Sequence, residues 1–478
     1  MTGTKVGGSD QLYPQVTIDA LPDNVLLEIF EFHLDKDDTD EFPLGHDYDR
    51  WQKLVHVCRR WRCIVFASPR RLDLELGCTE QSANSKLLDI WPALPIVVWV
   101  FAIQSKEQVV NVTAALREHD RVRKISYDDT DDCNIQDSML KEFAAIDEPF
   151  PALICLKLSS CVQNPVVLPD SFLGGSAPLL RTLDFDGIPY PSIGKLLLSA
   201  TDLVRLSLWR IPHSGYLAPN TIVPYLSMLS RLESLALVLK HPRPRAHRAS
   251  RHPPPLTRVV LANLTSLGLG GDIEYLEDIL SQIETPMLNQ SYFCFFNQLV
   301  FDTPLLGQYI RHTEIFTTIH TAHVRLNIRD VEVTLWGQDD DAELLDLQIT
   351  CKPLDWQLSA VAQVLNSLLS SLPILESLAI AVDRDDWQSE IEVTQWLEFF
   401  RPFTHVKEMT LVREDAVSLV APALQELAEE TATEVLPALQ ELTLSTDGWQ
   451  PSGPVEEAIC WFIGARQLYG RPVTVYLH

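Results

Sequence analysis

The stretch Leu203-Val204-Arg205-Leu206-Ser207-Leu208 has apolar residues at its first, fourth and sixth positions. Residues two apart share one face of a strand, so Leu206 and Leu208 would point into the same core. The pattern recurs, with middle residues 23 to 33 positions apart except for one long gap. It occurs as Val122/Ile125/Tyr127, Leu153/Leu156/Leu158, Leu180/Leu183/Phe185, Leu232/Leu235/Leu237, Leu264/Leu267/Leu269, Phe296/Leu299/Phe301, Leu375/Leu378/Ile380, Val406/Met409/Leu411 and Leu439/Leu442/Leu444.

The segments between these patterns have helical spacing. Apolar residues share a helical face in the sets Ile222/Tyr225/Leu226/Leu229, Ile273/Leu276/Leu280/Ile283, Leu358/Val361/Leu365/Leu368 and Val455/Ile459/Phe462/Ile463. Strands joined by crossing helices form a parallel sheet. One such unit cannot bury its apolar face alone, but stacked units cover one another. We therefore predict an α/β (α+β) fold, with an irregular leucine-rich-repeat solenoid over residues 71–478 that has a curved parallel sheet and crossing helices.

Several segments add to or interrupt this solenoid. Val331–Leu335 and Leu344–Ile349 flank a Gly- and Asp-rich turn, which predicts a hairpin insertion over residues 331–349. We expect further strands at Leu72-Asp73-Leu74, Ile96–Val100 and Val473–Leu477, and a turn at Gly268, Gly270 and Gly271. Residues 240–255 form a basic, Pro-rich insertion, which we interpret as a surface loop, a contact for an acidic partner or a nuclear-import patch.

The N-terminal part has a different pattern. Leu21-Pro22 precedes an apolar stripe formed by Val25, Leu26, Ile29 and Phe30, and proline suits the first turn of a helix. Helical spacing also connects Trp51, Leu54, Val55, Cys58, Arg62 and Val65, which predicts one second amphipathic helix. Such a short module carries more apolar surface than it can bury alone. The remainder of the chain or another protein would have to cover it.

Leu21-Pro22, the apolar helix and Val57-Cys58-Arg59-Arg60-Trp61 together resemble an F-box, and the sequence as far as Pro95 is similar to fungal F-box proteins with leucine-rich repeats. The resemblance implies a trihelical F-box at residues 17–70, after a flexible tail at 1–16. It also implies docking to a Skp-type adaptor, and through it to a cullin-RING ubiquitin ligase, while the repeats bind a protein substrate. The implied adaptor-binding residues are Leu21, Pro22, Val25, Leu26, Ile29, Phe30, Val57, Cys58 and Trp61.

Two features bear on this resemblance. The segment between Phe30 and Val57 is longer than in the family pattern and contains an acidic run at 35–41, which puts the second F-box helix in question. We expect Arg59 and Arg60 to face solvent. The apolar residues could instead pack inside a terminal cap of the solenoid. Two other functions stay open: a leucine-rich-repeat scaffold without ligase association, and an enzyme with a site on the repeat surface.

Composition limits the partners. The 478 residues include 38 Lys and Arg against 65 Asp and Glu, a net charge of −27. Such acidity argues against binding to nucleic acid or to an anionic membrane. The nine cysteines are dispersed, as in reduced proteins, and the first residues contain no apolar signal core. We therefore expect a cytoplasmic and/or nuclear protein.

The sequence offers no constellation typical of catalysis. No phosphate-binding loop, His-Glu-x-x-His or Gly-x-Ser-x-Gly motif occurs. His320 and His323 lie three apart, which on a strand places them on opposite faces and is unsuited to one metal ion. We therefore predict no catalytic residues, no cofactor and no metal, and assign chemistry to other subunits.

Overall fold

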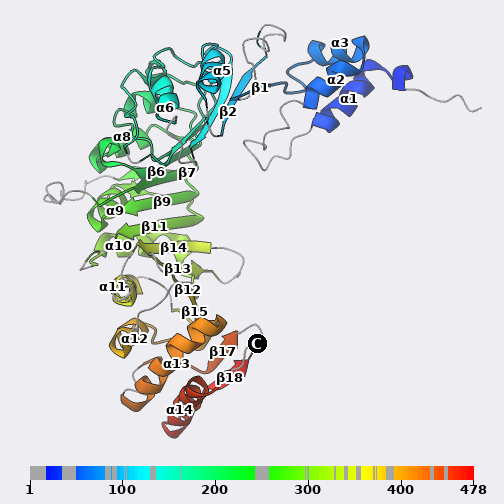
Figure 1. Ribbon diagram of the computed structural model, residues 1–478. Helices are drawn as coiled ribbons and strands as arrows, with labels where there is room; N and C mark the ends of the chain where they lie inside the picture. Colours follow the sequence, from blue (N-terminus) through cyan, green and yellow to red (C-terminus); the bar gives the residue numbers. More distant parts are fainter. Residues whose placement is uncertain are drawn as a thin grey trace, which may run out of the picture.

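The computed structural model describes residues 18–34, 50–80, 88, 94–101, 103, 105–129, 136–162, 164–242, 258–296, 298, 301–327, 330–337, 343–350, 357–369, 372, 374–383, 392–430, 435–445 and 451–477. The tail at 1–16, the acidic run at 35–41 and most of the basic insertion at 240–255 therefore lie outside the described residues. Sixteen described strands form one large sheet, which is mostly parallel, and helices accompany it (Figure 1). The fold is mixed α/β, as predicted.

The described chain begins with a 3-10 turn, Ile18–Ala20, and three helices: α1 (Asp23–Leu34), α2 (Arg50–Val57) and α3 (Arg59–Ala67). The single helix predicted through Trp51 and Val65 is wrong, because the chain breaks at Cys58. Cys58 is extended (φ −157°, ψ 170°), and its Sγ accepts a hydrogen bond from the Trp61 backbone N–H. A side-chain acceptor at this position satisfies an amide that would otherwise lack a partner, so α3 starts separately. The first half of the predicted helix is α2, and the second half is α3.

An insertion of three strands divides the sheet. The other thirteen strands pair only with parallel neighbours. They are β1 (Leu76–Thr79), β2 (Ile96–Val100), β3 (Val122–Asp129), β4 (Cys155–Ser160), β5 (Thr182–Asp186), β6 (Arg205–Ile211), β7 (Ser234–Leu239), β9 (Ser266–Gly271), β11 (Gln290–Phe296), β15 (Ser377–Val382), β16 (Glu408–Val412), β17 (Glu441–Ser445) and β18 (Thr474–Leu477). A separate two-stranded sheet pairs β8 (Val259–Val260) with β10 (Ile283–Glu284).

The predicted apolar positions line up across the sheet. Ile125, Leu156, Leu183, Leu206, Leu235 and Leu267 are direct partners on successive strands. The row continues beyond the insertion through Leu378, Met409, Leu442 and Val475. A shift of one residue would turn these side chains to the other face, so their burial fixes the register.

The insertion is a three-stranded meander: β12 (Thr321–Leu326), β13 (Asp330–Trp336) and β14 (Glu343–Thr350). The predicted hairpin corresponds to β13 and β14, which pair antiparallel. In space the meander is reversed, because β14 pairs with β11 while β12 pairs with β15, both parallel. Only β13 runs against the rest, so the direction of the sheet is the same on both sides of the insertion.

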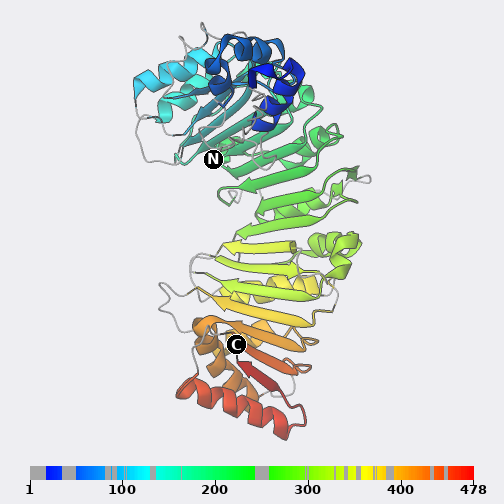
Figure 2. The ribbon, with the colours of Figure 1, turned by 90° about the vertical axis from the view of Figure 1, so that its right-hand side faces the viewer.

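Helices cover the apolar face of the sheet. They are α5 (Lys106–Leu116), α6 (Gln136–Ala144), α7 (Gly194–Ser199), α8 (Pro219–Leu226), α9 (Ile273–Leu280), α10 (Pro304–His312), α11 (Gln357–Leu369), α12 (Val393–Phe400), α13 (Arg413–Glu430) and α14 (Pro454–Leu468). Helices α8 to α12 lie along one side of the sheet in Figure 1, and Figure 2 shows the strands stacked along the long axis of the molecule. The alternate residues of the strands form the opposite face, which we call the open face.

Two strand predictions need correction. Leu72 and Leu74 are buried but precede the first strand, which begins at Leu76. The strand predicted around Phe296 to Phe301 is β11, which ends at Phe296 and puts Ser291 in the apolar row beside Leu267. Because Ser291 is polar, the repeated apolar pattern could not be recognised at this strand.

The three glycines predicted as a turn lie inside β9. A Cβ on Gly270 would lie 2.6 Å from Val238 Cγ1 on β7, so this position requires glycine for close approach of the strands.

Candidate protein-docking site on the N-terminal helices

The inner faces of α1, α2 and α3 pack on one another. Leu26 and Phe30 of α1 are completely buried, and the Phe30 ring lies 4.7 Å from that of Trp61 on α3. Trp51 of α2 is buried and meets the edge of Phe66. Burial of each such side chain contributes on the order of 2 kcal/mol, so this interior holds the three helices together. We call α1, α2 and α3 the helical unit.

A second apolar face of α1 is directed away from this interior. Pro22, Val25, Ile29 and Phe32 follow one another at helical spacing, and we call them the outer stripe. Ile29 is 42% exposed and Phe32 is 84% exposed. The stripe therefore presents large apolar groups to solvent on a short helix.

The nine predicted site residues divide between these two faces. Pro22, Ile29 and Val57 are exposed, with Val57 59% accessible at the end of α2, whereas Leu21, Val25, Cys58 and Trp61 are half-buried. The prediction that Leu26 and Phe30 face a partner does not hold, because both lie wholly inside the helical unit. Periodicity alone could not tell the inner face of α1 from the outer one. Phe32 was missed, although its spacing from Ile29 was a usable signal.

Arg60 connects the two ends of the motif. Its guanidinium contacts Asp23 Oδ1 at 2.6 Å and donates to the Leu21 carbonyl oxygen at 2.6 Å. Arg60 was expected to face solvent, but these contacts leave its side chain 36% exposed and fix the start of α1 against α3. Arg59 does face solvent. An exposed ion pair contributes little to the free energy of unfolding. The hydrogen bond to the Leu21 carbonyl oxygen fixes the orientation of the Arg60 guanidinium.

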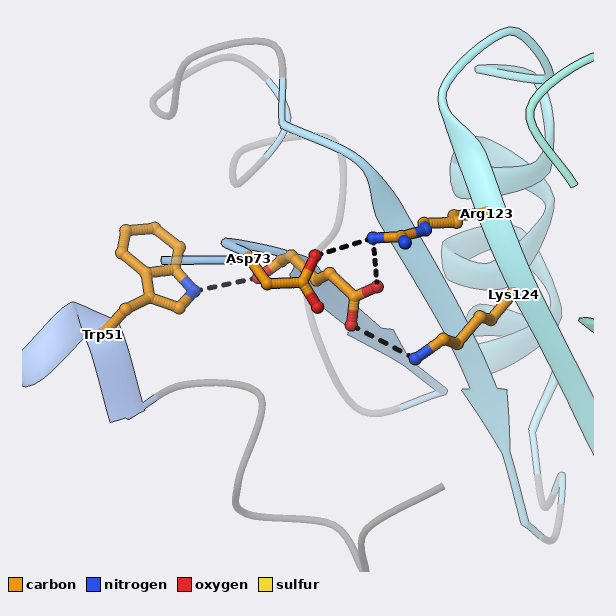
Figure 3. Close-up of polar contacts among 5 residues, drawn as sticks. Trp51, Asp73, Arg123 and Lys124 are labelled. Atoms are coloured by element: carbon orange, nitrogen blue, oxygen red, sulfur yellow. Dashed lines mark hydrogen bonds and ion pairs between the residues drawn. The ribbon is translucent and has the colours of Figure 1, made fainter. Parts of the chain in front are cut away.

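A polar joint ties the helical unit to the sheet (Figure 3). Trp51 Nε1 donates to the Glu75 carbonyl oxygen at 2.8 Å. The buried Glu75 carboxylate lies 3.3 Å from Arg123 Nη1 and 3.5 Å from Lys124 Nζ on β3, and Arg123 also reaches Asp73 at 2.7 Å. Removing a carboxylate from water is costly, and charged partners at these distances offset part of that cost. The helical unit contributes Trp51 of α2 to this joint, and no residue of the outer stripe of α1 takes part in the contacts named here.

Among the residues that the structure describes, the helical unit exposes the apolar side chains of Ile29, Phe32 and Val57. Across the whole described part of the chain, no group of three or more His, Cys, Asp or Glu residues is placed to hold a metal ion. His320 precedes β12 and His323 lies within it. None of the described helices combines the length and the apolarity that crossing a bilayer would require.

No model of a protein family matches the chain, and a search of curated proteins finds none similar to it.

Proposed function

We propose that this chain is the substrate-recognition subunit of a Skp-cullin-F-box type ubiquitin ligase. In this proposal the helical unit is the F-box and docks the Skp-type adaptor, which connects it to the cullin-RING ligase. The observation that carries the proposal is the outer stripe, because α1 is already packed through Leu26 and Phe30 and still exposes Ile29 and Phe32. Exposed apolar patches of this kind mark protein-binding surfaces.

The second half of the proposal concerns the sheet. Stacked parallel strands with an apolar row in register are what a leucine-rich-repeat solenoid requires, and crossing helices on one face leave the open face for a substrate. Ubiquitin transfer would then be performed by other subunits, in the cytoplasm and/or the nucleus. The chain itself would act as a non-catalytic adaptor.

The test is co-purification of the full chain with a Skp-type adaptor. Ile29→Asp combined with Val57→Asp places charges at exposed positions, so the fold should be retained while adaptor binding is lost. A central apolar anchor contributes about 2 kcal/mol or more, which corresponds to a loss of about thirtyfold in affinity. Val110→Asp on α5 is the matched control, because Val110 is 66% exposed and apolar but lies outside the helical unit.

Two outcomes would contradict the proposal. If the unaltered chain does not bind the adaptor, it is a repeat scaffold without a ligase link. If the double variant binds as well as the Val110→Asp control, the adaptor uses another surface.

A further inference from the structure

The open face of the sheet is hollowed where its side chains are smallest. A cavity of about 360 Å³ lies over β6, β7, β9, β11 and β14. Its floor includes Ala236 and Gly268, which are direct partners on β7 and β9. A Cβ on Gly268 would already lie 3.3 Å from the Ala236 Cβ, so the absence of a side chain there creates the hollow.

Two aromatic rings form a wall of this hollow. Trp209 on β6 and Tyr292 on β11 approach to 5.5 Å between ring centroids, although β7 and β9 lie between their strands. They can meet because Ala236 and Gly268 place almost no side chain between them. The Tyr292 hydroxyl donates to Gln348 Oε1, and Gln348 Nε2 donates to Asp330 Oδ2 at 2.8 Å. The Tyr292 side of the wall is therefore held in position by hydrogen bonds before anything binds.

Two carboxylates, those of Asp346 and Glu343, lie beside this wall, against one cationic side chain, Arg205, in the same lining. Asp346 is the direct partner of Tyr292 on β14, and Glu343 lines the same hollow. Asp346 Oδ1 is shielded from solvent and accepts no hydrogen bond. Burial, followed by the nearby Glu332 and Glu343, raises the pKa of Asp346 to about 7. A buried carboxylate oxygen without a donor is costly, and a bound cation would satisfy it.

We propose that this hollow binds a basic side chain, Arg or Lys, of a protein segment lying on the open face. The cation would lie against Trp209 and Tyr292 and pair with Asp346 and Glu343, since aromatic faces and carboxylates both attract cations. This inference rests on the proposed function, for which it gives the substrate class: a protein with an exposed basic segment. The proposed subunit, with a net charge of −27, would favour such a partner.

A neighbouring hollow indicates a polypeptide as the occupant. Trp209 also lines a second cavity of about 420 Å³ over β3 to β6, where Asp128, Asp184 and Asp186 outnumber Lys157. Asp186 is paired with Arg210, and burial raises the pKa of Asp184. Because the two hollows share Trp209, an extended basic segment would fill both, whereas a single small cation would fill one.

The test measures binding of probes to the full chain by calorimetry or Trp fluorescence. The probes are a Gly-Ser peptide carrying two Arg residues, its counterpart with citrulline, which keeps the shape and lacks the charge, and arginine amide. One or two side chains in open hollows should give affinities of about 1 mM or somewhat tighter. We expect the Arg peptide to bind more tightly than arginine amide, and the citrulline peptide at least tenfold more weakly than the Arg peptide.

Variants locate the site. Asp346→Asn should weaken the Arg peptide about tenfold, and Gly268→Leu should abolish its binding by filling the hollow, without a change of charge. Asp202→Asn is the matched control, because Asp202 is an exposed aspartate paired with Arg231 outside the hollow. Unfolding temperatures show whether each variant is folded, and Asp346→Asn is expected to fold because it removes a buried charge.

The pH dependence gives a second readout. Below pH 7 Asp346 takes up a proton in the free chain, so binding should weaken about tenfold between pH 8 and pH 6, and Asp346→Asn should flatten this slope. The charged or titratable groups around Asp346 are Glu343 on β14, Asp330 and Glu332 on β13, His323 and Arg325 on β12, and Tyr292 and Cys294 on β11.

Three results would overturn this inference: no binding of the Arg peptide, equal binding of the citrulline peptide, or binding unchanged by Asp346→Asn. If arginine amide binds as tightly as the peptide, the occupant is a small cation and not a protein segment. No adaptor is present in these measurements, so their failure is distinct from failure of the adaptor pull-down.

Discussion

The helical unit and the sheet each have one buried face, but they differ in the other face. Along α1 two large apolar side chains, Ile29 and Phe32, lie in solvent among exposed polar residues such as Glu28. Along the central strands the outward positions include small, polar and charged residues, such as Ser207, Ala236 and Asp346, beside the Trp209 and Tyr292 rings. An apolar outward face suits a lasting partner, whereas a polar, hollowed face suits a partner that is selected by charge and released. If both proposals hold, one chain carries surfaces for two kinds of partner, and the two outward faces show how such surfaces differ.

The largest expected effect comes from removing the Phe30 ring, which is buried inside the helical unit, because this tests which face of α1 is the inner one. Phe30→Ala should cost about 3–5 kcal/mol, because a completely buried ring is replaced by a cavity. Hydrogen exchange should show α1 to α3 losing protection while β4 to β9 keep theirs. Phe32→Ala two residues later is the matched control and should change stability by less than about 0.5 kcal/mol. Equal effects of the two variants would mean that the faces of α1 are assigned incorrectly.

A smaller effect is expected on the open face. Gly270→Val adds a side chain where a Cβ would lie 2.6 Å from Val238 Cγ1, and such overpacking costs about 1–3 kcal/mol. Chemical denaturation measures the loss. Gly464→Ala in α14 has no atom within 4 Å of the added carbon and should be neutral or slightly stabilising. If Gly270→Val is as harmless as this control, the strands are not closely packed at β9.

The smallest effect concerns the joint between the two regions. Trp51→Phe keeps an aromatic ring but leaves the Glu75 carbonyl oxygen without this 2.8 Å donor, at a cost of about 1 kcal/mol. Amide exchange in α2 should accelerate, while α3 and the central strands stay as protected as before. Uniform loss of protection across the whole sheet would show that the helical unit and the sheet do not unfold separately.

Much of the fold follows from local patterns. The register through Leu156, Leu183 and Leu206 could be predicted because apolar alternation allows only one face to be buried. The start of α1 followed from Leu21-Pro22 and the residues behind it. These features depend on residues close together in the sequence.

The remainder depends on which segments become neighbours. β11 was misplaced because Ser291 occupies a position that is apolar on nearby strands. The break at Cys58 and the inner position of Phe30 are decided by how three helices meet, which spacing within one helix does not encode. The hollow on the open face also escaped prediction, since Trp209, Gly268 and Tyr292 come together only through strand pairing.

The reversed meander also determines the order in which the sheet can be completed. Up to β11, each strand joins a partner made one crossing earlier, so this part can grow stepwise as the chain is synthesised. The next partner of β11 is β14, which is synthesised only after β12 and β13, and β15 must dock on β12. We therefore expect folding to pause at Phe296 and resume when the meander arrives, because closing a longer loop is slower. A ribosome-stalled chain ending shortly after β11 would bear the unpaired edge of that strand, the point at which a chaperone would be most needed.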